Sequence, residues 1–193
     1  GAEDVRSADT APVEALGLEP GRYLSVIARA EPENSLLEIV EGFSRKPRGM
    51  KLAVLGKYED GNAYHQAVKA AAGNEVMFLG AIYDKKVVQA LRFHSAAYVH
   101  GHQVGGTNPS LVEALGAGNA VIAHDNRFNR WVAGPGAAFF DGAAGFATQL
   151  DAILADPTRL DSMRKASRER FLAEFQWEKI LSEYETLLLK YQK

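Results

Sequence analysis

The sequence predicts an α/β fold: a doubly wound, parallel, six-stranded sheet of the Rossmann-like kind, followed by C-terminal helices. Six short apolar runs recur along the chain and are nearly continuous in apolar character. That pattern is typical of strands buried on both faces of a parallel sheet. Segments with apolar residues at helical spacing separate the runs, as the crossovers of such a sheet require.

The boundaries of the elements follow from these patterns. The expected strands span residues 23–28, 51–55, 75–79, 96–99, 120–123 and 137–140. Beyond residue 140 the pattern is wholly helical, and Asp156-Pro157 ends one helix and starts the next. A final helix carries a strong amphipathic stripe that includes Trp177, Leu181 and Tyr184. We expect this helix to pack on the sheet; the alternative is that part of it docks on a domain absent from this chain.

Length and composition predict one globular domain. Residues 1–20 are polar and are expected to form a linker with at most a turn of helix, and residues 21–193 are expected to form the domain. The net charge is −2, and the sequence lacks the excess of clustered positive charge that is typical of nucleic-acid-binding proteins. The absence of cysteine excludes disulfides and thiolate metal sites. Because the chain opens with Gly1-Ala2 in place of methionine, we expect the natural protein to continue upstream.

The expected ligand site lies where the strand order reverses. In open α/β sheets, ligands bind beyond the carboxyl ends of the strands at this switch point. With strand order 3-2-1-4-5-6, the switch falls between the first and fourth strands. The segments to inspect are therefore 28–34 and 100–110, which are among the most unusual stretches of the sequence.

The second segment has the pattern of an anion cradle. Asn108 is a favoured N-cap residue and Pro109 suits the first helical position, so a helix is expected to begin there. Gly105 and Gly106 allow close approach of the backbone to a phosphate at the positive end of the helix dipole. The amides expected to donate to such a phosphate are those of Thr107, Ser110 and Leu111. A glycine-rich turn with a purely structural role is the alternative.

Two charged residues complete the expected site. Arg29 follows the first strand, where its guanidinium can clamp phosphate oxygens; the alternative is a surface ion pair with Glu31 or Glu33. Glu113 lies one turn into the helix, where its carboxylate can accept hydrogen bonds from two neighbouring hydroxyls such as those of a ribose. The alternative for Glu113 is interaction with the helix dipole alone.

Histidines His100 and His102 stand two residues apart at the end of the fourth strand. A third ligand at suitable spacing is lacking, and the sequence has no Asp-x-Asp pair, so no metal and no other cofactor is expected. A hydrogen bond from one of these histidines to a sugar or phosphate is the favoured reading.

The segment Gly105-Gly106-Thr107-Asn108-Pro109-Ser110-Leu111-Val112-Glu113-Ala114-Leu115 resembles the donor-site signature of retaining, family-four-like GT-B glycosyltransferases. The sequences of residues 100–114 and 124–130 are more similar still to a bacterial rhamnosyltransferase-like branch of this family. The resemblance implies the C-terminal, nucleotide-sugar-binding domain of such an enzyme, without its N-terminal acceptor domain. It also implies that Glu113 binds the nucleotide ribose and that Arg29 holds the diphosphate.

Three positions depart from the family pattern. The first carboxylate of the signature would fall at Gly105, and the lysine of an Arg-x-x-Pro-x-Lys motif is Asn34, so that one cation is missing unless Lys57 replaces it. The branch usually has glutamate at Trp131. The first two departures put the contacts to the sugar and to the diphosphate in question.

The resemblance implies a glycosyltransferase that moves a sugar from a nucleoside diphosphate sugar to a glycan or lipid-linked acceptor in polysaccharide biosynthesis. Rhamnose carried by thymidine diphosphate is the expected donor, and the cytoplasm at the inner membrane face is the expected location, with membrane contact through the absent domain. This chain alone is expected to bind donor weakly and to turn over little. The alternatives are a non-hydrolysing sugar-nucleotide epimerase and a catalytically inactive nucleotide-sugar-binding domain.

Overall fold

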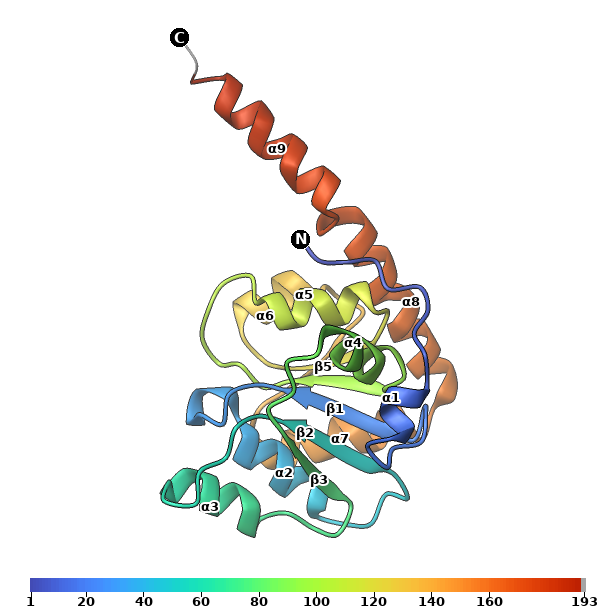
Figure 1. Cartoon of the computed structure of the whole chain (residues 1–193), viewed down its shortest axis with the longest axis vertical. Coiled ribbons are helices and arrows are strands. Elements are labelled where there is room, and N and C mark those ends of the chain that lie inside the picture. Colours follow the sequence, from blue (N-terminus) through green and yellow to red (C-terminus); the bar gives the residue numbers. More distant parts are fainter. Residues whose placement is uncertain (192–193) are drawn as a thin grey trace.

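The computed structural model describes residues 1–191 and contains the six-stranded sheet that the sequence predicts (Figure 1). All neighbouring strands are parallel, in the order β3-β2-β1-β4-β5-β6. The strands are β1 (Tyr23–Ile27), β2 (Lys51–Leu55), β3 (Val76–Gly80), β4 (Ala97–His100), β5 (Ala120–His124) and β6 (Ala138–Phe140). The doubly wound α/β fold is therefore confirmed, and each strand begins and ends within one residue of its predicted bounds.

Helices connect the strands and follow the last of them. They are α1 (Ala11–Glu14), the 3-10 turn η1 (Pro32–Asn34), α2 (Leu36–Ser44), α3 (Ala63–Ala70), α4 (Lys85–Phe93), α5 (Pro109–Gly116), α6 (Arg127–Ala133), α7 (Gly142–Leu154), α8 (Pro157–Glu174) and α9 (Trp177–Leu189). Within residues 1–191, no helix combines the length and the apolar character that a membrane span needs.

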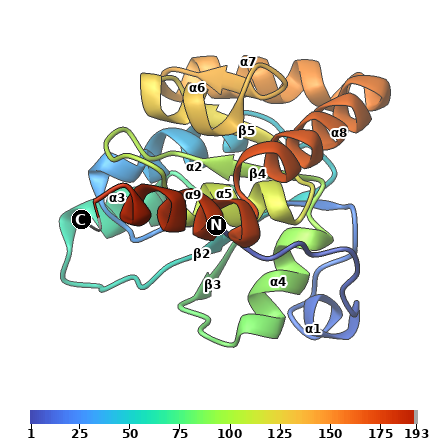
Figure 2. The ribbon, with the colours of Figure 1, turned by 90° about the horizontal axis from the view of Figure 1, so that it is seen from above.

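The helices cover both faces of the sheet (Figures 1 and 2). On one face α2, α3 and α7 pack on the strands, and the buried side chains include Ile39, Val68 and Phe146. On the other face α1, α4, α5 and α6 pack, and their core includes Leu91 and Leu115. Because both faces are covered, the strands are apolar along their whole length, which is the pattern seen in the sequence.

Residues 1–20, expected as a linker, lie along the domain. Helix α1 forms within them, and the side chains of Val13 and Leu18 are buried against Tyr23 of β1. At the other end of the segment, Ala2 forms a bridge to Gln176. The apolar side chains of residues 1–20 thus bury surface that a free linker would expose. The boundary between residues 20 and 21 stays a prediction.

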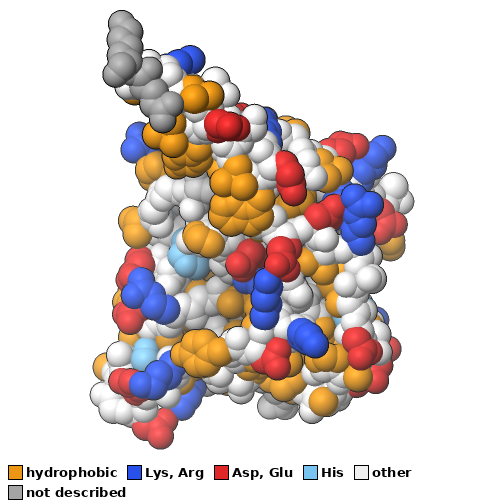
Figure 3. All heavy atoms as spheres, turned by 45° about the horizontal axis from the view of Figure 1, so that its top comes forward, with side chains coloured by type: hydrophobic (Ala, Val, Ile, Leu, Met, Phe, Trp, Pro, Cys, Tyr) orange, Lys and Arg blue, Asp and Glu red, His pale blue; other side chains and the backbone are white. Residues whose placement is uncertain are grey.

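Helix α9 departs from the sequence prediction. It extends away from the sheet (Figure 1), and none of its described residues is buried. Leu181, Tyr184 and Leu188 are 61%, 62% and 63% exposed, and hydrophobic side chains lie open along this helix in Figure 3. The expectation that α9 packs on the sheet is wrong, because an amphipathic stripe records that one face is apolar but not what covers it. Docking on another domain stays a prediction.

The loops that follow β1 and β4 pack backbone to backbone. Ser35 Oγ donates to the carbonyl of Gly101 at 2.8 Å, and the backbone amide of Gln103 donates to the carbonyl of Glu33 at 2.8 Å. Gly101 has no room for a side chain, because a Cβ there would meet the carbonyl oxygen of Asn34. A residue without a side chain at position 101 therefore allows the two loops to meet at the switch point.

We predict that Gly101→Ala lowers the free energy of unfolding by about 1–3 kcal/mol, since the methyl group forces the two loops apart. The measurement is urea unfolding followed by circular dichroism. Gly61→Ala is the matched control, because nothing lies within 4 Å of a Cβ at that exposed position. Equal stability of the two variants would contradict the close packing of the loops.

Candidate functional site

The structure brings the two predicted segments together at the switch point. β1 and β4 are neighbours in the sheet, and the pair Val26↔Val99 lies next to their carboxyl ends. Arg29 follows β1 as an exposed side chain, and among residues 1–191 no carboxylate lies within 4.0 Å of its guanidinium. The alternative of an ion pair with Glu31 or Glu33 is therefore not observed, and the cation is open to solvent.

The helix predicted after β4 begins at Pro109, with Asn108 as its N-cap. Asn108 Oδ1 accepts from the amide of Ser110 at 3.1 Å, and the Asn108 carbonyl accepts from the amide of Leu111 at 3.1 Å. These two amides, expected as phosphate donors, thus have acceptors inside the cap. A ligand would have to compete with the cap for them.

The open amides lie earlier in the loop. Gly105, Gly106 and Thr107 are exposed, and their amides find no backbone or side-chain acceptor in the described part of the chain. Gly105 has a φ of +123°, which L side chains rarely adopt. Three successive unpaired donors lie on an exposed loop at a helix start, an arrangement that suits an anion, and they lie nearer the glycines than the amides expected from the sequence.

The side chains of Ser110 and Leu111 have structural contacts. Ser110 Oγ lies 2.6 Å from the hydroxyl of Tyr98 on β4. Leu111 is fully buried in the core cluster with Val121. These contacts hold α5 against the sheet, and they fix where the glycine-rich loop emerges.

Asn34, which occupies the expected lysine position, faces into its own loop. The side chain is buried, and its Nδ2 donates to the carbonyl of Arg29 at 2.9 Å. Lys57, which could have replaced the missing cation, pairs with Glu59 at 2.8 Å. Asn34 therefore shapes the loop that presents Arg29 and supplies no second charge.

His65, to which the sequence assigned no role, supports the same loop. Its Nδ1 accepts from the amide of Glu59 at 2.8 Å, and its Nε2 lies 2.8 Å from the carbonyl of Ala30. A ring that accepts at Nδ1 carries its proton on Nε2, so it donates to Ala30. This bond ties the residue after Arg29 to the neighbouring loop.

His100 and His102 stack on each other, with ring centroids 4.3 Å apart. Burial lowers the pKa of His100 well below its usual value, and the charge of His102 adds to this. Burial also lowers the pKa of His102, as does the nearby charge of Arg29. Within residues 1–191 neither ring nitrogen of His100 has a hydrogen-bond partner, nor has Nδ1 of His102. Both rings are neutral at pH 7, and each can donate one hydrogen bond and accept another.

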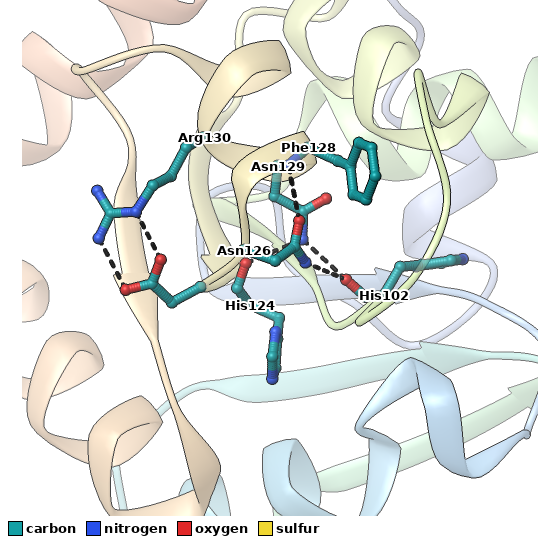
Figure 4. A network of polar contacts seen from close by, with 7 residues as sticks. His102, His124, Asn126, Phe128, Asn129 and Arg130 are labelled. Atoms are coloured by element: carbon teal, nitrogen blue, oxygen red, sulfur yellow. Dashed lines mark hydrogen bonds and ion pairs between the residues drawn. The ribbon is translucent and has the colours of Figure 1, made fainter.

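The backbone of His102 is held from a third element (Figure 4). Asn126 and Asn129 both point at the His102 carbonyl, to which their Nδ2 atoms donate at 3.0 and 2.8 Å. Asn129 also donates to the carbonyl of His124 at 2.9 Å. The segment 124–130 thus fixes the loop after β4 through contacts within the chain.

Glu113 forms an ion pair with Arg92 of α4, with 2.6 Å between Arg92 Nη2 and Glu113 Oε2. The arginine side chain is buried, whereas the carboxylate is about half exposed. Both line a pocket of about 420 Å³ that also borders Tyr83 and Trp177. The pocket meets the predicted site at Glu113. Among the described residues, no group of three His, Cys, Asp or Glu could hold a metal ion.

Comparison with known families identifies the chain. The family described as "Glycosyl transferases group 1" matches residues 14–170, which is most of the sequence. The chain belongs to this family. Comparison with curated protein sequences finds no match.

Solved structures share the fold of this group 1 glycosyl transferase chain. Sucrose-phosphate synthase from Thermosynechococcus elongatus matches with a TM-score of 0.79 and 20% identity, over 95% of this chain and 49% of that one. HepE from Anabaena, in complex with UDP, matches with a TM-score of 0.81 and 15% identity, over 94% and 52%. The C-terminal domain of a group 1 family protein, LpcC from Francisella tularensis, matches with a TM-score of 0.72 and 16% identity, over 91% and 96%. The chain thus spans about half the length of the first two.

Sequence reasoning missed Arg92 in this group 1 glycosyl transferase chain, although a signal was present. Val88, Leu91 and Arg92 fall on one face of α4 at helical spacing. A cation in an apolar stripe must be paired when it is buried, which points to a carboxylate partner. The pattern does not reveal that the partner is Glu113, because α4 and α5 meet only in the folded chain.

We predict that acid destabilises the fold through His100. The folded state disfavours its protonated form, whereas the unfolded chain takes up the proton near the ordinary pKa of about 6.5. Stability should therefore fall as the pH drops below that value, by up to about 1.4 kcal/mol per pH unit. Urea unfolding between about pH 7.5 and 5.5 measures the decline, and His100→Phe should reduce its slope. An unchanged slope in that variant would show that His100 is not the group responsible.

Proposed function

We propose that this chain is the donor-binding half of a glycosyltransferase, which moves a sugar from a nucleoside diphosphate sugar to an acceptor hydroxyl. One observation carries the proposal: an unpaired cation and three open amides follow β1 and β4 at the switch point of a group 1 glycosyl transferase domain, and the Glu113 carboxylate lies one turn into the helix that begins there. The cation and the amides match a diphosphate, and the carboxylate matches the hydroxyls of a ribose.

The diphosphate is the leaving group and gains negative charge as its bond to the sugar breaks. Arg29 and the amides of Gly105, Gly106 and Thr107 would stabilise that charge. Donors fixed by a folded loop need little rearrangement as the charge develops. We propose that these groups act in place of a metal ion, and no other cofactor is part of the scheme.

The sugar would lie beside the two stacked histidines. His102 is half-buried next to Arg29, and its Nε2, which has no hydrogen-bond partner within residues 1–191 and is not among the buried nitrogens, can bond a sugar hydroxyl. The family signature would place a carboxylate at Gly105, so this chain would hold the sugar with neutral groups there. Neutral contacts suit a sugar with fewer hydroxyls, such as the deoxyhexose rhamnose that the branch resemblance implies.

We propose that acceptor binding, the other half of the reaction, is carried out by protein outside this chain. The chain spans 49% of sucrose-phosphate synthase and 52% of HepE. We propose that a partner domain binds a glycan or lipid-linked acceptor, in bacterial polysaccharide biosynthesis in the cytoplasm at the inner membrane face. The exposed apolar face of α9 suits contact with that domain. The isolated chain would then bind donor weakly and turn over little.

A second candidate is an inactive nucleotide-sugar-binding domain. Gly105 and Asn34 favour it, because the expected carboxylate and second cation are both absent from the loops. Binding of a nucleotide sugar without transfer by the full-length protein would support this candidate. Transfer to an acceptor would exclude it.

We predict that one of UDP, GDP and dTDP binds this chain and that Arg29→Ala and Glu113→Ala each weaken binding about tenfold or more. Each variant loses a charge-assisted hydrogen bond to the ligand. Isothermal titration calorimetry with the three nucleotides measures the effect and names the base.

The controls for these variants are Arg45→Ala and Glu41→Ala, an exposed ion pair on α2. Both should leave the affinity unchanged, since neither side chain lies near the switch point. Equal losses in all four variants would contradict a specific site, and no binding to any nucleotide would refute the donor proposal for this chain.

A further inference from the structure

Arg92 is a buried cation that contacts Glu113 of the proposed site. Its side chain is 7% exposed and comes from α4, one crossover before the glycine-rich loop. Arg92 Nη2 lies 2.6 Å from Glu113 Oε2 and donates to Ser110 Oγ at 3.1 Å. One guanidinium nitrogen thus bonds two residues of α5 that are one turn apart.

The contacts continue from Ser110 to the end of β1. Tyr98 Oη, on β4, lies 2.6 Å from Ser110 Oγ and donates to the carbonyl of Ile27 at 3.4 Å. Ile27 is two residues before Arg29, so the chain of hydrogen bonds joins the base of the Arg29 loop to Glu113. Arg92 Nε is buried without a hydrogen-bond partner within residues 1–191, but the other contacts restrict the members of this network to one arrangement.

The ion pair constrains a side chain that would otherwise be free. Glu113 is 48% exposed, and an exposed glutamate on a helix surface samples several rotamers. Arg92 holds Oε2, and in the described part of the chain Oε1 has no hydrogen-bond partner. Glu113 and Arg92 line the same pocket, so Oε1 is the carboxylate oxygen that remains for a ligand.

We propose that Arg92 is a positioning residue for nucleotide binding, which fixes the Glu113 carboxylate so that its free oxygen meets the ribose hydroxyls. The inference rests on the proposed donor-binding function. Arg92 itself touches no ligand in this scheme; it acts through Glu113. A preset carboxylate loses less side-chain entropy on binding than a mobile one, so the arrangement raises affinity.

The test is a double-substitution cycle with Arg92→Gln, Glu113→Gln and the combined variant, each titrated with UDP, GDP and dTDP by calorimetry. We expect Arg92→Gln to weaken binding of the nucleotide that binds by about tenfold. The combined variant should bind no more weakly than Glu113→Gln alone, because the effect of Arg92 passes through Glu113. Arg92→Lys, which keeps the charge, should recover part of the affinity.

Arg48→Gln is the matched control. Arg48 is also a buried arginine, with a side chain 2% exposed, and it pairs with Asp151, which is 39% exposed. It bonds the carbonyls of Phe43 and Gly42, and Asp151 lies on α7, on the face of the sheet opposite to α4 and α5. Its loss and the loss of Arg92 should both lower the urea midpoint, but only the loss of Arg92 should change nucleotide affinity.

The outcomes separate the two proposals. If no nucleoside diphosphate binds the unsubstituted chain, the donor-binding function fails and the role of Arg92 falls with it. If Glu113→Gln weakens binding and Arg92→Gln does not, only the positioning role is overturned. Additive losses in the combined variant, or an equal loss in Arg48→Gln, would show that Arg92 is merely structural. Arg92→Lys keeps the test decisive if Arg92→Gln fails to fold.

Discussion

The contact between the loops that leave β1 and β4 is the constraint on which the rest of the site depends. These strands are neighbours, but the chain crosses from β1 toward one edge of the sheet and from β4 toward the other edge. The two loops therefore begin together and then diverge. Bonds between Ser35 and Gly101, and between Gln103 and Glu33, hold them where they begin. Backbone packing at this point leaves Arg29 on one side and the glycine-rich loop on the other. The arrangement that we propose as an anion site therefore depends on the topology together with one small residue.

Apart from His100 and His102, which have buried ring nitrogens without partners within residues 1–191, the polar groups around that contact fall into two sets. One set is paired within the chain: the Asn108 cap, the Ser110 hydroxyl, Asn34 and His65 all bond neighbouring backbone or side-chain atoms. The other set is open, and consists of Arg29 with the amides that precede Asn108. Paired groups fix geometry, because a buried polar atom without a partner is costly. Open groups at the rim are those that a ligand can reach.

The sequence predicted the fold class, because buried parallel strands leave continuous apolar runs. The meeting of the two segments followed once the strand order 3-2-1-4-5-6 was assumed for that class, and the structure has this order. The N-cap at Asn108 was equally accessible, since capping is local. What failed depended on contacts between distant elements. The apolar stripe of α9 did not reveal that it lacks a covering surface, and Glu113 did not reveal its partner Arg92. The amides of Ser110 and Leu111 were assigned to a phosphate because a sequence does not show which acceptors a cap supplies.

We propose above all that the loops after β1 and β4 hold a nucleoside diphosphate. A crystal structure of the chain with UDP, GDP or dTDP, whichever binds, tests it most directly. We expect the diphosphate to lie against Arg29 and the amides of Gly105, Gly106 and Thr107, with the nucleoside running toward Glu113. A nucleotide seated away from the carboxyl ends of β1 and β4, with Arg29 still free in solvent, would contradict it.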